Sequence, residues 1–176
     1  MNLQEVKLLI RDVRDFPKAG ILFKDITPIL ANPEARKLLI KLLAEQFASD
    51  GIEAVAGIEA RGFLFGMALA DVLNVPFLPV RKAGKLPYKR LSESYDLEYG
   101  TATVEIHEDA VRSGQKILIH DDLLATGGTA AAAGRLVKRL GGEVTGYSFV
   151  ISLPFLNGKH NLEQSFDAPV RSIFDF

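Results

Sequence analysis

Residues 116–130 read KILIHDDLLATGGTA, and this stretch decides the fold of the chain. Its apolar run, residues 117–119, predicts a short buried strand that ends at two adjacent carboxylates, Asp121 and Asp122. A glycine loop at residues 125–129 follows, and the alanine-rich run 130–140 favours a helix. Such a loop directs backbone N–H groups toward the positive end of the helix, which suits a phosphate.

The two aspartates restrict the kind of ligand, because carboxylates beside a phosphate cradle repel an anion unless they bind hydroxyls or a cation. A ribose supplies hydroxyls, and Mg²⁺ supplies a cation. The stretch therefore predicts a site for a sugar 5-phosphate whose diol is held by Asp121 and Asp122. The sequence contains neither GxxxxGK[ST] nor GxGxxG. The alternative is a surface loop that caps a helix, with two solvated aspartates.

The length of the chain favours one domain, residues 1–176, and the lack of a signal-peptide pattern or a membrane-spanning run favours the cytoplasm. The net charge of −1 and the pI near 6.3 give no electrostatic basis for binding nucleic acid. The chain has no cysteine, so disulfides and thiolate metal sites are excluded. No apolar run approaches the roughly 20 residues that a membrane span needs.

The apolar pattern alternates between strands and helices, which predicts an α/β fold with a mostly parallel sheet flanked by helices. Ligands of such sheets bind at the carboxyl ends of the strands, so we expect Arg61 to lie in one pocket with Asp121 and Asp122. Helices are predicted at residues 3–13, 33–47 and 63–73, and strands at 54–58, 76–80, 97–107, 144–153 and 170–174.

Residues 81–95 contain several lysines and arginines, a glycine and a proline, with little apolar periodicity. A loop of this length in a compact domain is typical of a lid over a site. A solvated mobile loop is the alternative.

The run of apolar residues, two acids, two apolar residues and ATGGT resembles the 5-phosphoribosyl-1-pyrophosphate (PRPP) motif of the type I phosphoribosyltransferases. Residues 16–30, 57–66, 81–88 and 94–100 narrow the resemblance to the members that act on adenine. The resemblance implies purine salvage, in which the 5-phosphoribosyl group passes from PRPP to adenine to give AMP and pyrophosphate. It also implies Mg²⁺, a homodimer, a small hood from about residues 1–30 and the C-terminal region, and a flexible lid at about 82–97.

The same resemblance assigns residue roles. Glu98 would act on a purine nitrogen and Arg61 on pyrophosphate as the catalytic residues, and Tyr99 would help to close the hood. The aspartates would lie near Mg²⁺ without holding it directly, because PRPP and water supply most of its ligands. The residues implied to bind PRPP or AMP are Asp121, Asp122, Ala125, Thr126, Gly127, Gly128, Thr129, Glu59, Ala60, Arg61, Gly62, Lys82, Lys85 and Tyr99. The two lysines would come either from the same subunit or from the other subunit of a dimer.

Base recognition would fall to Leu22, Phe23 and Lys24, with Leu153 on the other ring face. In an extended strand, residues 22 and 24 point their backbone groups the same way. The Leu22 carbonyl would accept from the exocyclic amine of adenine while the Lys24 N–H donates to N1, and a 6-oxopurine would leave both groups unpaired. Phe23 would stack on the purine, although residue type alone favours a core aromatic.

Two other functions stay open at this point. One is a phosphoribosyltransferase for xanthine or another 6-oxopurine, which needs a different edge pattern near Phe23. The other is a PRPP-sensing regulator without catalysis, which would be expected to carry a nucleic-acid-binding surface.

Overall fold

In this computed structural model, the described residues are 1–96 and 100–176. The chain divides into two compact units, residues 1–42 and residues 43–176. No helix in the described part of the chain is both long enough and apolar enough to cross a membrane.

The unit of residues 1–42 contains a two-stranded antiparallel hairpin between short helices. A capping box starts its first helix: the Asn2 side chain accepts from the Glu5 N–H at 3.0 Å, and the Glu5 carboxylate accepts from the Asn2 N–H at 2.7 Å. The elements in order are α1 (Leu3–Leu8), β1 (Arg11–Arg14), β2 (Leu22–Asp25), α2 (Thr27–Ala31) and α3 (Pro33–Gln46), whose last residues belong to the second unit.

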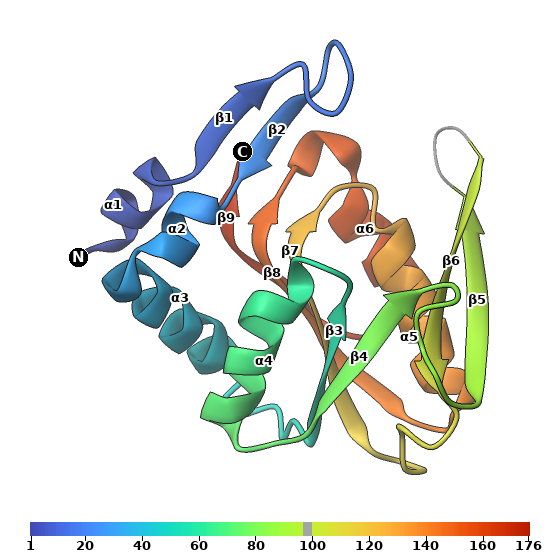
Figure 1. Cartoon of the computed structure of the whole chain (residues 1–176). Helices are drawn as coiled ribbons and strands as arrows, with labels where there is room; N and C mark the ends of the chain where they lie inside the picture. The colour runs from blue at the N-terminus through green and yellow to red at the C-terminus, as the bar shows by residue number, and fades with distance from the viewer. Residues whose placement is uncertain (97–99) are drawn as a thin grey trace. The chain divides into compact units, whose positions relative to one another are not determined.

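The unit of residues 43–176 is built on a seven-stranded sheet in the order β5-β6-β4-β3-β7-β8-β9 (Figure 1). Strands β4, β3, β7, β8 and β9 are parallel, whereas β6 is antiparallel to both β4 and β5. This confirms the predicted mostly parallel sheet. The strands are β3 (Ala54–Ile58), β4 (Phe77–Lys82), β5 (Arg90–Asp96), β6 (Thr101–His107), β7 (Lys116–Leu124), β8 (Glu143–Ser152) and β9 (Val170–Asp175).

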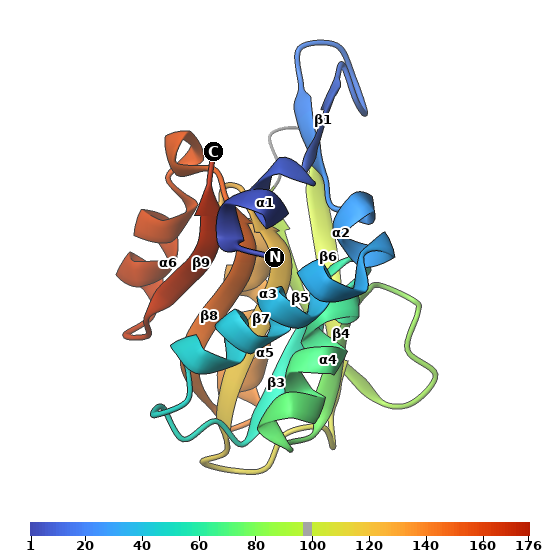
Figure 2. The same ribbon diagram turned by 90° about the vertical axis from the view of Figure 1, so that its left-hand side faces the viewer.

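Helices α4 (Gly62–Leu73) and α5 (Gly128–Arg139) lie on opposite faces of this sheet, as the two views in Figures 1 and 2 show. Small residues let α5 approach closely: a Cβ on Gly134 would overlap the Tyr147 hydroxyl. Leu136 and Val137 of α5 and Ile117 and Ile119 of β7 are fully buried. Burial of each such side chain contributes about 1.5–3 kcal/mol, so this layer holds the C-terminal half of α5 and the first half of β7 in the core.

Two predicted elements differ from the structure. The helix predicted at residues 3–13 ends at Leu8, and Val13 instead pairs with Phe23 across the β1–β2 hairpin. The loop predicted at residues 81–95 is wrong at both ends: residues 81–82 belong to β4, and residues 90–95 belong to β5, which pairs with β6. At Val13 and in β5, antiparallel pairing with the neighbouring strand of a hairpin decided the conformation. The C-terminal tail also holds a helix, α6 (Gly158–Ser165), after the short 3₁₀ helix η1 (Pro154–Leu156).

Candidate active site

The glycine loop between β7 and α5 borders a cavity of about 80 Å³. The cavity is lined by residues 123–130 together with Asp121 and Phe149. Gly127 caps α5 with a φ of 85°, a left-handed conformation that glycine adopts at least cost. The structure thus gathers the predicted phosphate-binding residues, 125–129, around a cavity at a helix N-terminus, where backbone N–H groups favour an anion.

Helix α6 supports this loop from behind. The Asn161 side-chain amide donates to the Thr126 carbonyl at 3.0 Å. A Cβ on Gly158 would overlap the Ala125 oxygen, and one on Gly127 would lie 3.0 Å from the Gly158 oxygen. The sequence pattern did not indicate Gly158 or Asn161; the Asn157-Gly158 dipeptide is typical of a turn, but nothing local links it to a loop more than thirty residues earlier.

Asp121 and Asp122 lie inside strand β7, which corrects the prediction that the strand ends before them. The strand continues because β8 pairs with it as far as Leu124 opposite Ser152. Successive side chains of a strand point to opposite faces. Asp121 accordingly lines the loop cavity, while Asp122 Oδ2 lies 3.0 Å from Arg61 Nε.

The two carboxylates have perturbed acidities. Burial raises the pKa of Asp121 well above its usual range, and the neighbouring charge of Asp122 raises it further. Burial also raises the pKa of Asp122, although the Arg61 guanidinium opposes that shift. Ribose hydroxyls or a cation would favour the ionised forms. Carboxylate oxygens suit Mg²⁺, and no third His, Asp or Glu joins the pair into a metal-binding group within the described residues. The donor set therefore fits a cation that takes most of its ligands from a bound substrate and water.

Arg61 precedes helix α4, at the end of the loop that follows β3. The Glu59–Ala60 peptide bond in this loop is cis. Gly62, the first residue of α4, packs directly on Asp121: a Cβ there would lie 2.8 Å from Asp121 Oδ1 and 3.0 Å from Asp121 Cα. The predicted proximity of Arg61 to the aspartate pair is therefore confirmed, although of these three residues only Asp121 lines the loop cavity. A second helix N-terminus points at the same strand.

Glu59 connects this loop to the end of β4. Its carboxylate accepts from Arg81 at 3.1 Å (Nε to Oε2) and 3.3 Å (Nη2 to Oε1), and from the Lys82 N–H at 3.0 Å. Burial would raise the pKa of Glu59, but the hydrogen bonds from Arg81 and Lys82 outweigh it and lower that pKa. Glu59 is thus an ionised structural anchor in this structure.

Lys82 and Lys85 flank a tight turn and are exposed. The Lys85 N–H donates to the Lys82 carbonyl at 3.3 Å, and Arg81 Nη1 donates to the Lys85 carbonyl at 3.0 Å. Arg81 therefore binds both Glu59 and this turn. The sequence pattern assigned Arg81 no role, because a pairing across 22 residues leaves no local signal.

The remaining predicted residues belong to other segments of the chain. Leu22, Phe23 and Lys24 form part of β2 in the unit of residues 1–42, where the Phe23 ring meets Phe16 edge-on at 5.0 Å between centroids. Lys24 Nζ lies 2.6 Å from Asp12 Oδ1. Leu153 follows β8, and its N–H donates to the Leu124 carbonyl at 2.9 Å. Glu98 and Tyr99 lie outside the described residues, so their predicted roles stay predictions.

Comparison with known proteins places these features in a family. Residues 25–165 match the family model of the phosphoribosyl transferase domain. The chain is 54% identical over 163 residues to the adenine phosphoribosyltransferase of Yersinia pestis (strain Pestoides F), which covers 93% of this chain and 87% of that protein.

Solved structures agree. The adenine phosphoribosyltransferase of Thermoanaerobacter pseudethanolicus superposes with a TM-score of 0.96 at 48% identity, covering 99% of this chain and 100% of that one. The Saccharomyces cerevisiae protein, solved with an imino-altritol bisphosphate and adenine, has a TM-score of 0.90 at 43% identity, with 98% of each chain covered.

Proposed function

This chain belongs to the adenine phosphoribosyltransferase family, and we propose that the site described above performs that family's reaction here. The reaction transfers the 5-phosphoribosyl group of PRPP to adenine, with AMP and pyrophosphate as products. The observation that carries the proposal is the ion pair of Arg61 with Asp122, 3.0 Å apart, beside the loop cavity that Asp121 lines. Two helix N-termini and a carboxylate pair thus converge on one strand end.

The phosphate and the ribose of PRPP would bind on the β7 side of this site. The 5-phosphate would receive N–H groups of residues 125–129 at the positive end of α5. Asp121, which faces the same cavity, would accept from a ribose hydroxyl. Displacement at the anomeric carbon develops positive charge on the ribose, and ionised carboxylates beside the ring stabilise such charge.

Pyrophosphate would bind where the loop at residues 59–62 meets the turn at residues 82–85. Arg61, oriented by Asp122, would supply a positive charge to pyrophosphate. Lys82 and Lys85 would supply two more, either from the same subunit or from the second subunit of a dimer. Mg²⁺, when bound, would neutralise oxygen charge on the departing pyrophosphate. Asp121 and Asp122 would approach it through water or substrate oxygens.

Recognition of adenine by Leu22, Phe23 and Lys24, with Leu153 on the other ring face, remains part of the proposal. So does proton transfer at the base by Glu98, with Tyr99 closing the hood. A carboxyl group shielded from water can have its pKa raised into a range useful for this step. A cytoplasmic location stays a prediction from composition.

A homodimer is also proposed. Leu64 and Met67, three residues apart on α4, are 50% and 47% exposed, and Val72 is 59% exposed. Such an apolar helix face favours contact with another surface, and a second copy is the occupant that the family resemblance implies. Light scattering of the wild type and of Met67→Glu tests this: a dimer that the substitution converts to a monomer is expected, and a monomeric wild type would contradict it.

The reaction is tested by pyrophosphate release from PRPP and Mg²⁺ with adenine, hypoxanthine, guanine, xanthine or orotate supplied separately. Release with adenine alone, accompanied by AMP, is expected. Release with an oxopurine instead would still support the assigned PRPP site but would contradict the proposed recognition of adenine. No release with any base would favour a regulator that senses PRPP without catalysis.

A further inference from the structure

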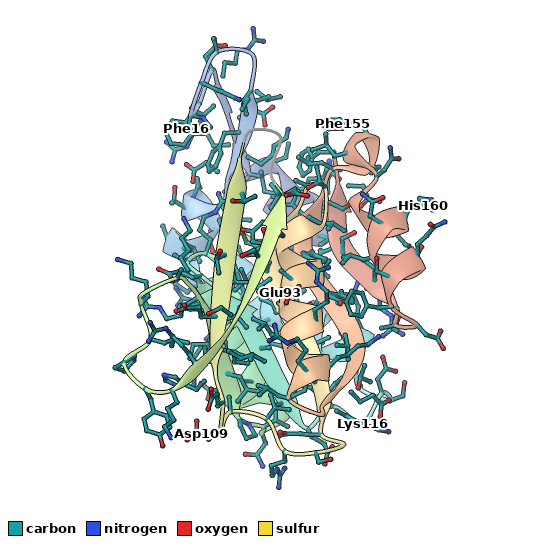
Figure 3. All side chains as sticks on the ribbon, turned by 90° about the vertical axis from the view of Figure 1, so that its right-hand side faces the viewer. Phe16, Glu93, Asp109, Lys116, Phe155 and His160 are labelled. Atoms are coloured by element: carbon teal, nitrogen blue, oxygen red, sulfur yellow. The ribbon has the colours of Figure 1, made fainter. Side chains whose placement is uncertain are left out.

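Glu93 lies on the face of strand β5 that packs against helix α5 (Figure 3). Residues of β5 alternate between half-buried and exposed, so Leu91, Glu93 and Tyr95 share one face. Leu91 and Tyr95 pack against the hydrophobic core. A carboxylate between two apolar residues is costly unless it is paired, so its partners decide how β5 sits on the helix.

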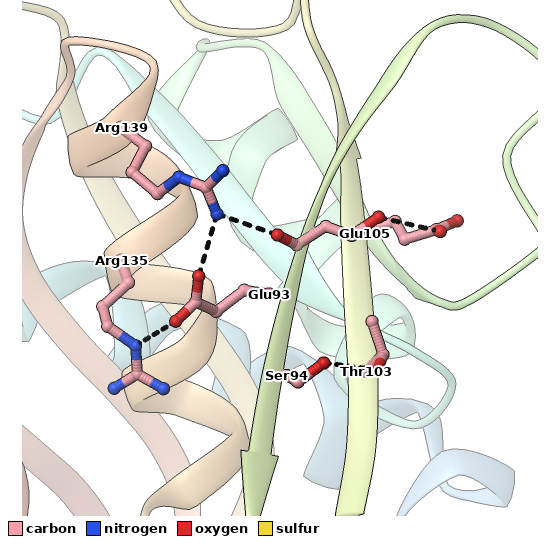
Figure 4. A network of polar contacts seen from close by, with 7 residues as sticks. Glu93, Ser94, Thr103, Glu105, Arg135 and Arg139 are labelled. Atoms are coloured by element: carbon pink, nitrogen blue, oxygen red, sulfur yellow. Dashed lines mark hydrogen bonds and ion pairs between the residues drawn. The ribbon is translucent and has the colours of Figure 1, made fainter.

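The partners of Glu93 are two arginines one helical turn apart on α5 (Figure 4). Arg135 Nε lies 2.5 Å from Glu93 Oε1, and Arg139 Nη1 lies 2.9 Å from Oε2. Arg139 Nη1 also donates to the Ser92 carbonyl at 2.8 Å. The hydrogen bond from Arg135 lowers the pKa of Glu93 against the effect of burial, and Arg139 adds to this. One ionised side chain thus fixes the rotation and the position along the axis of the helix against the strand.

The same strand contacts the first residue of α5. A Cβ on Gly128 would lie 3.3 Å from Tyr95 Cδ2 and 3.6 Å from the Asp96 carbonyl oxygen. Gly128 lines the loop cavity. The end of β5 therefore forms one wall behind the phosphate loop, two residues along the strand from Glu93.

The contacts continue to the far side of the hairpin. Ser92 Oγ donates to Glu105 Oε1 at 3.1 Å, and Glu105 Oε2 accepts from the Gly84 N–H at 2.9 Å and lies 3.0 Å from Arg90 Nε. Gly84 lies between Lys82 and Lys85. The polar network therefore runs from α5, through β5 and β6, to the turn that carries both lysines.

We propose that Glu93 is a positioning residue that, through Arg135 and Arg139, fixes strand β5 against α5 and thereby sets the geometry of the 5-phosphate loop. This rests on the proposed function, since it assumes that the loop binds the 5-phosphate. A change at Glu93 should affect the affinity for the 5-phosphate group most, because β5 contacts the loop directly at Gly128. The affinity for pyrophosphate should change less. Glu93 is linked to Gly84, in the turn that carries Lys82 and Lys85, only through Arg139 and three further hydrogen bonds.

The test is calorimetric titration of the wild type and of Glu93→Gln with ribose 5-phosphate and, separately, with pyrophosphate and Mg²⁺. We expect the Kd for ribose 5-phosphate to rise about three- to tenfold, as for loss of a partly exposed charge-assisted pair. The Kd for pyrophosphate should stay within about twofold. Arg135→Lys, which keeps the charge but not the fixed Nε donor, should give a smaller rise, and it replaces Glu93→Gln if that variant does not fold.

Asp50→Asn is the matched control, because Asp50 and Glu93 are each 19% exposed and each pair with an arginine. It should lower Tm without changing either Kd. If Glu93→Gln, like the control, lowers Tm and changes neither Kd, Glu93 has only a structural role and the inference is wrong. The same holds if Glu93→Gln weakens the binding of both ligands equally. If the wild type itself fails to bind ribose 5-phosphate, the assigned phosphate site is wrong and this inference falls with it; unchanged binding in Glu93→Gln removes only the inference.

Discussion

Arg81 holds Glu59 through two hydrogen bonds of 3.1 and 3.3 Å while a third guanidinium nitrogen binds the Lys85 carbonyl at 3.0 Å. One side chain therefore fixes both segments that are proposed to bind pyrophosphate. A lysine reaches the carboxylate as a point charge but lacks the planar set of donors that spans the two segments.

We expect Arg81→Lys to raise the KM for pyrophosphate about tenfold in the reverse reaction, the size of one charge-assisted contact, with the KM for AMP changed less than about twofold. Initial rates at varied pyrophosphate and AMP check this. Arg171→Lys is the control, because Arg171 is 34% exposed against 33% for Arg81 and also pairs with a carboxylate. Equal changes in both KM values for Arg81→Lys would contradict a role specific to pyrophosphate.

Asp121→Asn is expected to stabilise the free protein while abolishing use of PRPP. The folded-state pKa of Asp121 is raised, so the folded protein binds more protons than the unfolded chain, and the charged carboxylate costs stability above that pKa. Its removal should raise Tm by about 2–4 °C at pH 7.5, equivalent to about 1 kcal/mol. The gain should vanish as the pH falls toward 3.8, the ordinary pKa of Asp.

Scanning calorimetry at pH 7.5 and pH 4 measures the gain, and Asp109→Asn, at an exposed position, should show none. Near-normal turnover of Asp121→Asn with PRPP would remove Asp121 from ribose binding.

Gly127→Ala tests the phosphate loop itself. Gly127 has a φ of 85°, and an added Cβ would lie 3.0 Å from the Gly158 oxygen. Gly114→Ala is the matched control, since Gly114 has a φ of 73° and a Cβ added there would have no neighbouring atom within 4 Å. Both substitutions should cost about 1 kcal/mol in unfolding free energy from the left-handed backbone.

Only Gly127→Ala should also weaken ribose 5-phosphate, by about tenfold or more, because its loop must move away from α6. Calorimetric titration of both variants measures this. Equal affinities in the two variants would show that the loop tolerates the added methyl group.

His120 should make the stability of the protein fall in mild acid. Its ring is fully buried, with Nδ1 3.1 Å from Ser148 Oγ, and burial lowers its pKa from 6.5 to about 3. The unfolded chain therefore binds a proton between pH 6.5 and pH 3 that the folded protein does not. Stability rises with pH in this window by up to about 1.4 kcal/mol per pH unit.

The raised pKa values of Asp121 and Asp122 act with the opposite sign, so the difference between wild type and His120→Asn isolates the histidine. Urea unfolding at pH 7, 6 and 5 should show the wild type losing stability relative to the variant as the pH falls. Parallel curves would mean that the folded and unfolded proteins protonate this ring over the same pH range, which would contradict the lowered pKa.

Local pattern in the sequence predicted the parts of the fold that local chemistry dictates. The apolar run of β7, the glycine loop and the small residues of α5 are contiguous, and in the structure the end of β7, the loop and the start of α5 line one cavity. Arg61 was correctly predicted beside the aspartates because parallel strands bring their carboxyl ends to one edge.

The missed features depend on partners in other elements of the fold, some in the next strand and some further along the chain. β5 is a strand because β6 pairs with it, and Val13 is extended because Phe23 lies opposite. Neither Arg81 with Glu59 nor Glu93 with Arg135 follows from spacing, since each pair forms only after its strands or helix are assembled. A charged residue on the inner face of an alternating strand, as at Glu93, is the one signal that could have indicated a paired partner.

Strand β7 is paired with β3 so that Ala54 lies opposite Ile117, and this contact closes the long chain segment between the two residues. Closing such a long loop loses chain entropy early, and folding dominated by distant pairings takes about milliseconds to seconds in small domains. The phosphate loop follows β7, so we expect it to bind a ligand only once this pairing has formed. Ribose 5-phosphate should then slow unfolding, when present in an unfolding experiment, and leave the refolding rate unchanged, when present in a refolding experiment.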